Sequence, residues 1–208
     1  MGKIQAEDYT VEERVVISYI LERPGQKQGN LMIDRLQHTQ TKDWEISLSA
    51  QEFKSWTQSS NCKTLYFDGA SKSNPGQAGA GGVIVNEAGD NICSYEWSLG
   101  ERTNNNAEAL ALYQGLLQLK KLGIKRAMVF GDSAIIIRLM IHKQSSPNCN
   151  LQQLINRIKI FLKNFEDIQF YHVLRILNKQ ADTRANNACG RMTGALRCNA
   201  IDSFHPIP

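Results

Sequence analysis

Residues 63–98 read KTLYFDGASKSNPGQAGAGGVIVNEAGDNICSYEWS, and this stretch decides the fold class. It holds three β-type runs, at residues 63–68, 82–86 and 92–98, separated by breaks rich in Gly, Asn and Pro. Consecutive strands joined by short connections pair in antiparallel fashion. The stretch therefore predicts an antiparallel meander of three strands.

Helices and strands alternate after this meander. Helical spacing and end signals predict helices at residues 104–121, 133–142, 151–165 and 179–190, with strands at 126–131 and 168–174 between them. Alternating elements of this kind form parallel crossovers. The fold class we expect is α/β, with a mixed five-stranded sheet flanked by helices.

Residues 1–61 form an amino-terminal extension in this interpretation. Thr10-Val-Glu-Glu13 is a capping-box pattern, and the apolar residues that follow at helical spacing predict a helix that ends near Pro24. A second capping pattern begins at Ser49, before Phe53 and Trp56, and predicts another helix; residues 57–61 are expected to be a linker. We therefore expect a helical extension that either docks a partner or packs on the main domain, a domain at residues 62–190, and a tail at residues 191–208 in strand or coil.

The composition is that of a folded chain. It has 208 residues, 24 Lys and Arg against 20 Asp and Glu, and 42% hydrophobic residues, which is enough to bury a core. The net charge of +4 divides into −2 for residues 1–61 and +6 for residues 62–208, so the second part is the one suited to a polyanion. Five Cys without a C-x-x-C pair indicate a reducing, intracellular location, and no apolar run reaches the roughly 20 residues of a membrane span, so no membrane partner is expected.

Four acidic residues lie where a solvated surface acid is not expected. Asp68 and Asp132 each end an apolar strand, and the carboxyl ends of neighbouring strands are where ligands bind in open α/β sheets. Glu108 lies on a half-apolar helix face, so its carboxylate needs a partner. Asp182 lies in the first turn of the last helix, where a favourable interaction with the helix dipole is the alternative reading.

If these four acids converge, cations must accompany them. Each pair of like charges at about 4 Å repels by roughly 4 kcal/mol at an effective dielectric constant near 20. Ligation by carboxylate oxygens alone favours a hard ion such as Mg²⁺ or Mn²⁺.

Four segments of the chain resemble the signature segments of ribonuclease H. They occur in the order and at the spacing of that family, cover roughly residues 63–190, and are most similar to the plant-type and retroelement-associated subfamily. The segments are Phe67-Asp-Gly-Ala-Ser-Lys-Ser-Asn-Pro-Gly76, Thr103-Asn-Asn-Asn-Ala-Glu108, Gly131-Asp-Ser133 and His172-Val-Leu-Arg-Ile-Leu-Asn-Lys-Gln-Ala-Asp182.

The resemblance implies a ribonuclease H-like fold and an endoribonuclease that hydrolyses the RNA strand of an RNA·DNA hybrid. By similarity, Asp68, Glu108, Asp132 and Asp182 are the catalytic residues and the ligands of two Mg²⁺ ions, with Mn²⁺ as a substitute. The hybrid is the implied partner. The residues implied to contact nucleic acid are Asn74, Thr103, Asn104, Asn105, Arg175 and Asn178.

The chain also departs from the family pattern. Ala134 stands where many relatives have Gln, and Ile176 replaces an acid. His172 aligns within the last strand, so we expect a structural role rather than proton transfer. No basic protrusion is present, since residues 145–149 are short and uncharged, and we expect weaker hybrid binding with the metal chemistry intact.

The same patterns allow other interpretations. A catalytically silent module that binds nucleic acid or a protein stays open as the alternative function, whereas an integrase or transposase core is disfavoured by the spacing of the acids. The glycines at residues 76–82 favour close packing over a phosphate loop, because no Lys-Ser or Lys-Thr follows them. A zinc site at Cys189, Cys198 and His205 has no usual ligand spacing, and Trp44, Trp56 and Trp97 are expected to pack rather than stack on bases.

Overall fold

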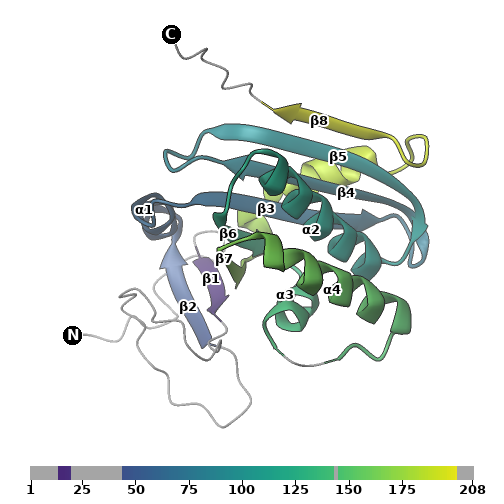
Figure 1. Cartoon of the computed structure of the whole chain (residues 1–208), viewed down its shortest axis with the longest axis horizontal. Helices are drawn as coiled ribbons and strands as arrows, with labels where there is room; N and C mark the ends of the chain where they lie inside the picture. Colours follow the sequence, from purple (N-terminus) through teal and green to yellow (C-terminus); the bar gives the residue numbers. More distant parts are fainter. Residues whose placement is uncertain (1–13, 20–43, 143–144, 201–208) are drawn as a thin grey trace.

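A computed structural model of the chain describes residues 14–19, 44–142 and 145–200. Its centre is one mixed sheet of eight strands in the order β2-β1-β7-β6-β3-β4-β5-β8 (Figure 1). The strands are β1 (Arg14–Tyr19), β2 (Trp44–Ser49), β3 (Lys63–Ser71), β4 (Gly76–Val85), β5 (Asn91–Arg102), β6 (Arg126–Gly131), β7 (Asp167–His172) and β8 (Leu196–Ala200).

The five predicted strands form the middle of this sheet. β3, β4 and β5 pair as the expected antiparallel meander, and β6 runs parallel to both β3 and β7. β4 begins at Gly76, earlier than predicted, because its glycines lie within the strand. A Cβ atom at Gly81 would lie 2.2 Å from the backbone nitrogen of Ala185, so the glycine lets a helix approach the strand closely, as the sequence suggested.

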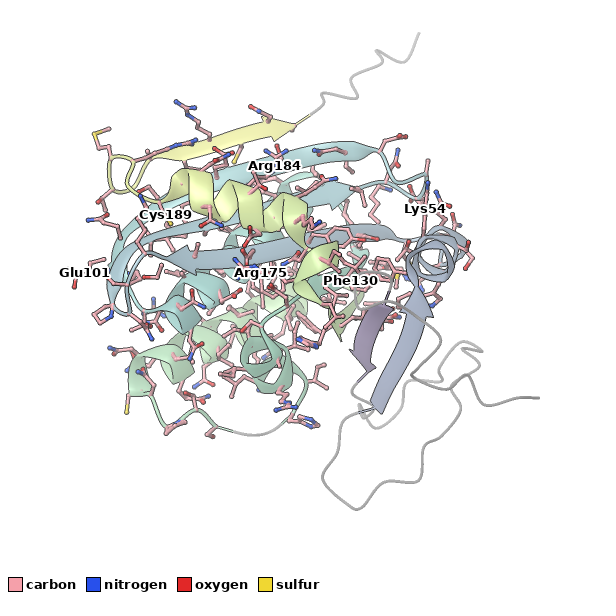
Figure 2. All side chains as sticks on the ribbon, turned by 180° about the vertical axis from the view of Figure 1, so that it is seen from behind. Lys54, Glu101, Phe130, Arg175, Arg184 and Cys189 are labelled. Atoms are coloured by element: carbon pink, nitrogen blue, oxygen red, sulfur yellow. The ribbon has the colours of Figure 1, made fainter. Side chains whose placement is uncertain are left out.

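The helices cover both faces of the sheet. They are α1 (Ala50–Ser59), α2 (Asn104–Lys121), α3 (Ala134–Ile141), α4 (Cys149–Phe161) and α5 (Lys179–Ala188), with short 3-10 turns at Leu162–Asn164 and Arg175–Leu177. Figure 1 shows α2, α3 and α4 on one face, and Figure 2 shows α5 on the other. The main core lies under α2, where Leu65, Phe67, Leu112 and Leu116 are fully buried.

The amino-terminal extension differs from the prediction. Residues Arg14–Tyr19, expected to be helical, form strand β1, which pairs with β2 from Arg14↔Ser49 to Tyr19↔Trp44 and meets β7 at Ser18↔His172. The purely helical extension is therefore wrong for the described residues. Three consecutive β-branched residues, Val15 to Ile17, favour a strand, and the periodicity of so short a run does not separate the two states. The other residues of that helix lie outside the described part.

The second predicted helix of the extension is confirmed as α1, and it also includes the first part of the expected linker. Phe53 is buried, and its ring lies 5.3 Å from that of Phe130 in an edge-to-face contact. The ring of Trp56 contacts that of Tyr171 in the same way, at 5.1 Å. α1 thus covers β6 and β7 with a second, aromatic core.

The carboxyl-terminal tail contributes the edge strand β8, which agrees with the expected strand or coil. β8 pairs with β5 from Cys93↔Ala200 to Trp97↔Leu196, and a turn held by Ser98 precedes it. No helix in the described ranges is both long and apolar enough to cross a membrane.

Candidate metal centre

Three carboxylates from three different elements meet beside the central strands β3 and β6 of the sheet. Asp68 belongs to β3, Glu108 to α2, and Asp132 follows β6 directly. Each offers an oxygen, and these oxygens all lie within 4.8 Å of one another. Among the residues that the structure describes, this is the one group of His, Cys, Asp and Glu that could hold a metal ion. The expected convergence is therefore present for three of the four acids, although Asp68 lies within β3, which continues to Ser71, and does not end the strand as predicted.

Gly69 allows Glu108 to approach the other two acids. A Cβ atom at position 69 would lie 2.1 Å from the backbone nitrogen of Glu108, so only glycine allows α2 to pack against β3 here. The backbone N–H of Gly69 also donates a hydrogen bond to Glu108 Oε2 at 3.2 Å. The sequence alone assigned Gly69 no role, although a glycine inside a strand is a signal for such close approach.

Asn178 holds Asp132 in place. Its amide donates to the carbonyl oxygen of Phe67 at 2.8 Å and to Asp132 Oδ1 at 3.1 Å, and the residue is 0% exposed. His172 Nε2 lies 3.0 Å from the backbone oxygen of Asp132, which fits the expected structural role. A residue without exposure does not reach a nucleic acid, so the expected hybrid contact of Asn178 does not fit this position.

Asp182 stands beside the three acids and has a cationic partner of its own. Arg175 Nε donates to Asp182 Oδ1 at 3.0 Å, and Nη2 of the same arginine contacts that oxygen as well. The side chain of Arg175 is 73% exposed and that of Asp182 is 23% exposed. The pair therefore lies at the rim of the centre, with a guanidinium that faces solvent.

Burial and the neighbouring charges raise the pKa of Asp68 and that of Glu108. Burial, followed by the charges of Asp132 and Asp182, raises the pKa of Asp68 from 3.8 to about 8. Burial and the charges of Asp68 and Asp132 raise the pKa of Glu108 well above its usual value, against the opposing hydrogen bond from Gly69. A bound divalent cation would relieve this repulsion, and an all-carboxylate donor set fits Mg²⁺ or Mn²⁺.

Polar residues at the start of α2 lie next to this centre. Thr103 is the N-cap of α2, and its side chain accepts a hydrogen bond from the backbone of Asn106. Asn74 is exposed, and its side-chain oxygen accepts from the backbone nitrogen of Asn104 at 3.1 Å. Asn104 is exposed and Asn105 is half-buried, one turn before Glu108. These four of the predicted nucleic-acid contacts therefore form one polar rim.

The alternative zinc ligands do not converge. The thiol of Cys189 lies against the carbonyl oxygens of Ala70 and Ala185 beneath α5, whereas Cys198 lies beside Gln114 of α2 on the other face. His205 lies outside the described residues.

The comparisons with known proteins agree with this geometry. A family model described as reverse transcriptase-like matches residues 66–188. The solved ribonuclease H1 of Halobacterium salinarum superposes with a TM-score of 0.59 at 32% identity, covering 61% of this chain and 96% of that structure. The chain belongs to the ribonuclease H family.

Two further solved structures of this family are similar to the chain. The amino-terminal RNase H domain of a Mycobacterium tuberculosis protein gives a TM-score of 0.59 at 30% identity, over 61% of this chain and 98% of that one. LC11-RNase H1, solved in complex with an RNA/DNA hybrid, gives a TM-score of 0.57 at 32% identity, over 61% of this chain and 96% of that one.

The full-length relatives are longer than the shared region. The ribonuclease HI of Halobacterium salinarum is 33% identical over 123 residues, which is 59% of this chain and 62% of the relative. Residues 1–61 lie outside the family match. The ribonuclease H fold is thus the shared part, and β1, β2 and α1 lie outside the family match.

Proposed function

We propose that this chain is a metal-dependent endoribonuclease that hydrolyses the RNA strand of RNA·DNA hybrids. The observation that carries the proposal is the convergence of Asp68, Glu108 and Asp132, whose oxygens lie within 4.8 Å of one another in a ribonuclease H fold. The similarity to LC11-RNase H1, which was solved with a hybrid, supports the choice of substrate.

Four acids would bind the metal ions, and two other residues orient them. Asp68, Glu108 and Asp132, with Asp182 at the rim, would hold two Mg²⁺ ions. Bound ions of this kind activate a water and stabilise the leaving oxygen in phosphodiester hydrolysis. Gly69 and Asn178 fix the orientation of Glu108 and Asp132, so the ligands need little rearrangement when a cation binds.

The polar rim at the start of α2 would bind the substrate. Asn74, Asn104 and Asn105 carry amide groups suited to the minor groove of a hybrid, where 2′-hydroxyls both donate and accept hydrogen bonds. Arg175 is exposed and close to the acids, so its guanidinium is suited to a backbone phosphate. These contacts would orient the RNA strand with its phosphodiester at the carboxylates.

Asp68→Asn is the direct test. The substitution removes a buried ligand charge, and the loss of several kcal/mol of metal-dependent stabilisation is expected to lower kcat at least about 100-fold. Hybrid binding should stay measurable, because the rim is untouched. Cleavage of a labelled hybrid in Mg²⁺ measures kcat, and fluorescence anisotropy in EDTA measures hybrid binding.

Glu166→Gln is the matched control, because Glu166 is an exposed acid outside the centre. It should cleave like the wild type. Double-stranded RNA and double-stranded DNA of the same sequence serve as control substrates, assayed in Mg²⁺ and in Mn²⁺. Undiminished cleavage by Asp68→Asn would refute the assignment of the centre.

A catalytically silent module is the second candidate, and one observation favours it. Asp182 is paired with Arg175 and is not part of the group of three acids, so the fourth ligand would have to leave its partner to meet a cation. If no hybrid is cleaved in either metal while binding persists, this candidate replaces the first.

A further inference from the structure

A second charged cluster lies on the α5 face of the sheet, outside the metal centre. Arg184, Arg191, Arg197 and Glu96 meet there, and Figure 2 labels Arg184 on α5. With Ser94, Tyr95 and Asn199 they line a hollow of about 220 Å³. None of these residues belongs to the four segments that carry the resemblance to ribonuclease H.

The fold brings the three arginines together from three segments. Glu96 of β5 lies opposite Gly81 of β4 on one side and Arg197 of β8 on the other. Because Gly81 has no side chain, α5 packs directly on β4, and Arg184 of α5 comes within reach of Glu96. Arg191 follows α5, and its carbonyl oxygen accepts a hydrogen bond from Ser98 Oγ at 3.0 Å.

The positive charge of the hollow exceeds what Glu96 can balance. Arg191 Nη1 donates to Glu96 Oε2 at 2.5 Å, and Arg184 Nη1 lies 3.8 Å from Oε1. One carboxylate among three guanidinium groups leaves a net charge of +2 on the lining residues. Among the described residues Arg197 has no ion-pair partner, so none of them balances this surplus of positive charge.

An arginine donor in this cluster also has no acceptor. Arg184 Nε is buried, and no hydrogen bond to it is found among the described residues. Leaving a buried donor unpaired costs about 1–3 kcal/mol. The guanidinium of Arg184 therefore keeps a hydrogen-bonding capacity that the described residues do not use.

We propose that this hollow binds a phosphate group. Guanidinium groups present paired N–H donors that match the oxygens of phosphate, and the Ser94 hydroxyl and the Asn199 amide add neutral donors. Glu96 binds one guanidinium nitrogen of Arg191 and one of Arg184 and so orients both groups. The other guanidinium nitrogens stay available for the ligand.

The source we favour is the backbone of the nucleic acid, which rests on the proposed function. Asp182 and Arg184 are two residues apart on α5, and successive residues turn by about 100°, so they project to opposite sides of the helix. A helix with its side chains is about 10–12 Å wide. A strand held at the acids could therefore reach the hollow by crossing α5 within a few nucleotides.

The first experiment measures inorganic phosphate binding to the full chain by calorimetry in EDTA. Arg197→Gln, at the exposed end of the cluster, removes one charged partner and should weaken phosphate binding about tenfold. Arg184→Gln should have a similar effect. Arg126→Gln is the matched control, since Arg126 is exposed at the start of β6 and should retain the wild-type affinity.

The second experiment distinguishes the two sources of phosphate. Binding of a hybrid with single-stranded extensions is measured in EDTA at several salt concentrations. If the backbone occupies the hollow, Arg197→Gln lowers the slope of log K against log salt by about 0.7–0.9, one phosphate contact. If only inorganic phosphate is affected, the ligand is a free phosphate compound.

Unchanged affinities for both ligands in both variants would overturn the proposal and leave the arginines as partners of Glu96 alone. No arm requires catalysis, so a chain that failed to cleave hybrids would still give a clear answer about the hollow.

Discussion

The environment of Asp68 differs strongly from that of a free side chain. Its pKa is raised to about 8 by burial and by the neighbouring acids, so the folded chain without metal holds a proton there that the unfolded chain releases near pH 4. The folded state binds more protons between these values. The carboxyl of Asp68 therefore contributes stability that is present below pH 4 and is lost as the pH rises to about 8.

The prediction is that Asp68→Asn flattens the pH dependence of stability in EDTA. Between pH 5 and 7 the wild-type free energy of unfolding should fall relative to that of the variant by up to about 1.4 kcal/mol per pH unit. Urea unfolding at several pH values measures the difference. Parallel curves for the two proteins would mean that folding does not raise the pKa of Asp68.

The hydrogen bonds of Asn178 give a second prediction. Asn178→Ala leaves the carbonyl of Phe67 unpaired and Asp132 unsupported, so the free energy of unfolding should fall by about 1–3 kcal/mol. If Asn178 positions Asp132, kcat should fall and KM should stay close to its wild-type value. A raised KM with an unchanged kcat would instead indicate substrate contact. The neighbouring exposed residue offers the control Lys179→Ala.

The acids could be predicted from sequence because each stands at a recognisable position on a strand or helix, and Asp68, Glu108 and Asp132 do converge. The role of Asn178 could not, because its contacts with Phe67 and Asp132 span 111 and 46 residues. Local patterns carry no information about which buried amide meets which carboxylate.

Helix α1 lies outside the family match and packs an apolar face on the sheet. Phe53→Ala should lower the free energy of unfolding by about 3–5 kcal/mol, because it removes a buried ring in contact with Phe130. Lys54→Ala on the exposed side of the same helix is the control and should change stability by less than about 0.5 kcal/mol. Chemical denaturation of the full chain measures both.

An equal, small effect of the two substitutions would show that α1 does not pack on β6 and β7 in solution.

The elements differed in how well the sequence predicted them. α2 has the predicted bounds because eighteen residues of helical periodicity follow a capping threonine and precede Gly123. β1 was predicted as a helix because its six residues allow either period, and its pairing with β2 lies across 24 residues that separate the two strands. β8 similarly depends on the free edge of β5, which no local pattern reveals.

In the whole molecule, α5 separates the acidic metal centre from the arginine-lined hollow. The acids lie at its amino-terminal end and toward β3, and the arginine hollow lies across it, toward β5 and β8. Such an arrangement suits a polyanion that is attracted by one site and, once a cation has bound, processed at the other. The net charge of the chain conceals this division.

Metal binding should therefore stabilise the whole fold through this one centre. Mg²⁺ at 100 times its Kd would stabilise the native state by about 2.7 kcal/mol per site, which corresponds to a rise in Tm of about 5–10 °C for a chain of this size. In Asp68→Asn the rise should largely disappear, because the buried ligand of β3 is neutral. Glu166→Gln should retain it. Calorimetric scans with EDTA and with increasing Mg²⁺ measure the shift, with Ca²⁺ included as a second oxygen-seeking ion. An equal rise in Tm for Asp68→Asn and the wild type would place the bound cation elsewhere and remove the physical basis for the proposed hydrolysis.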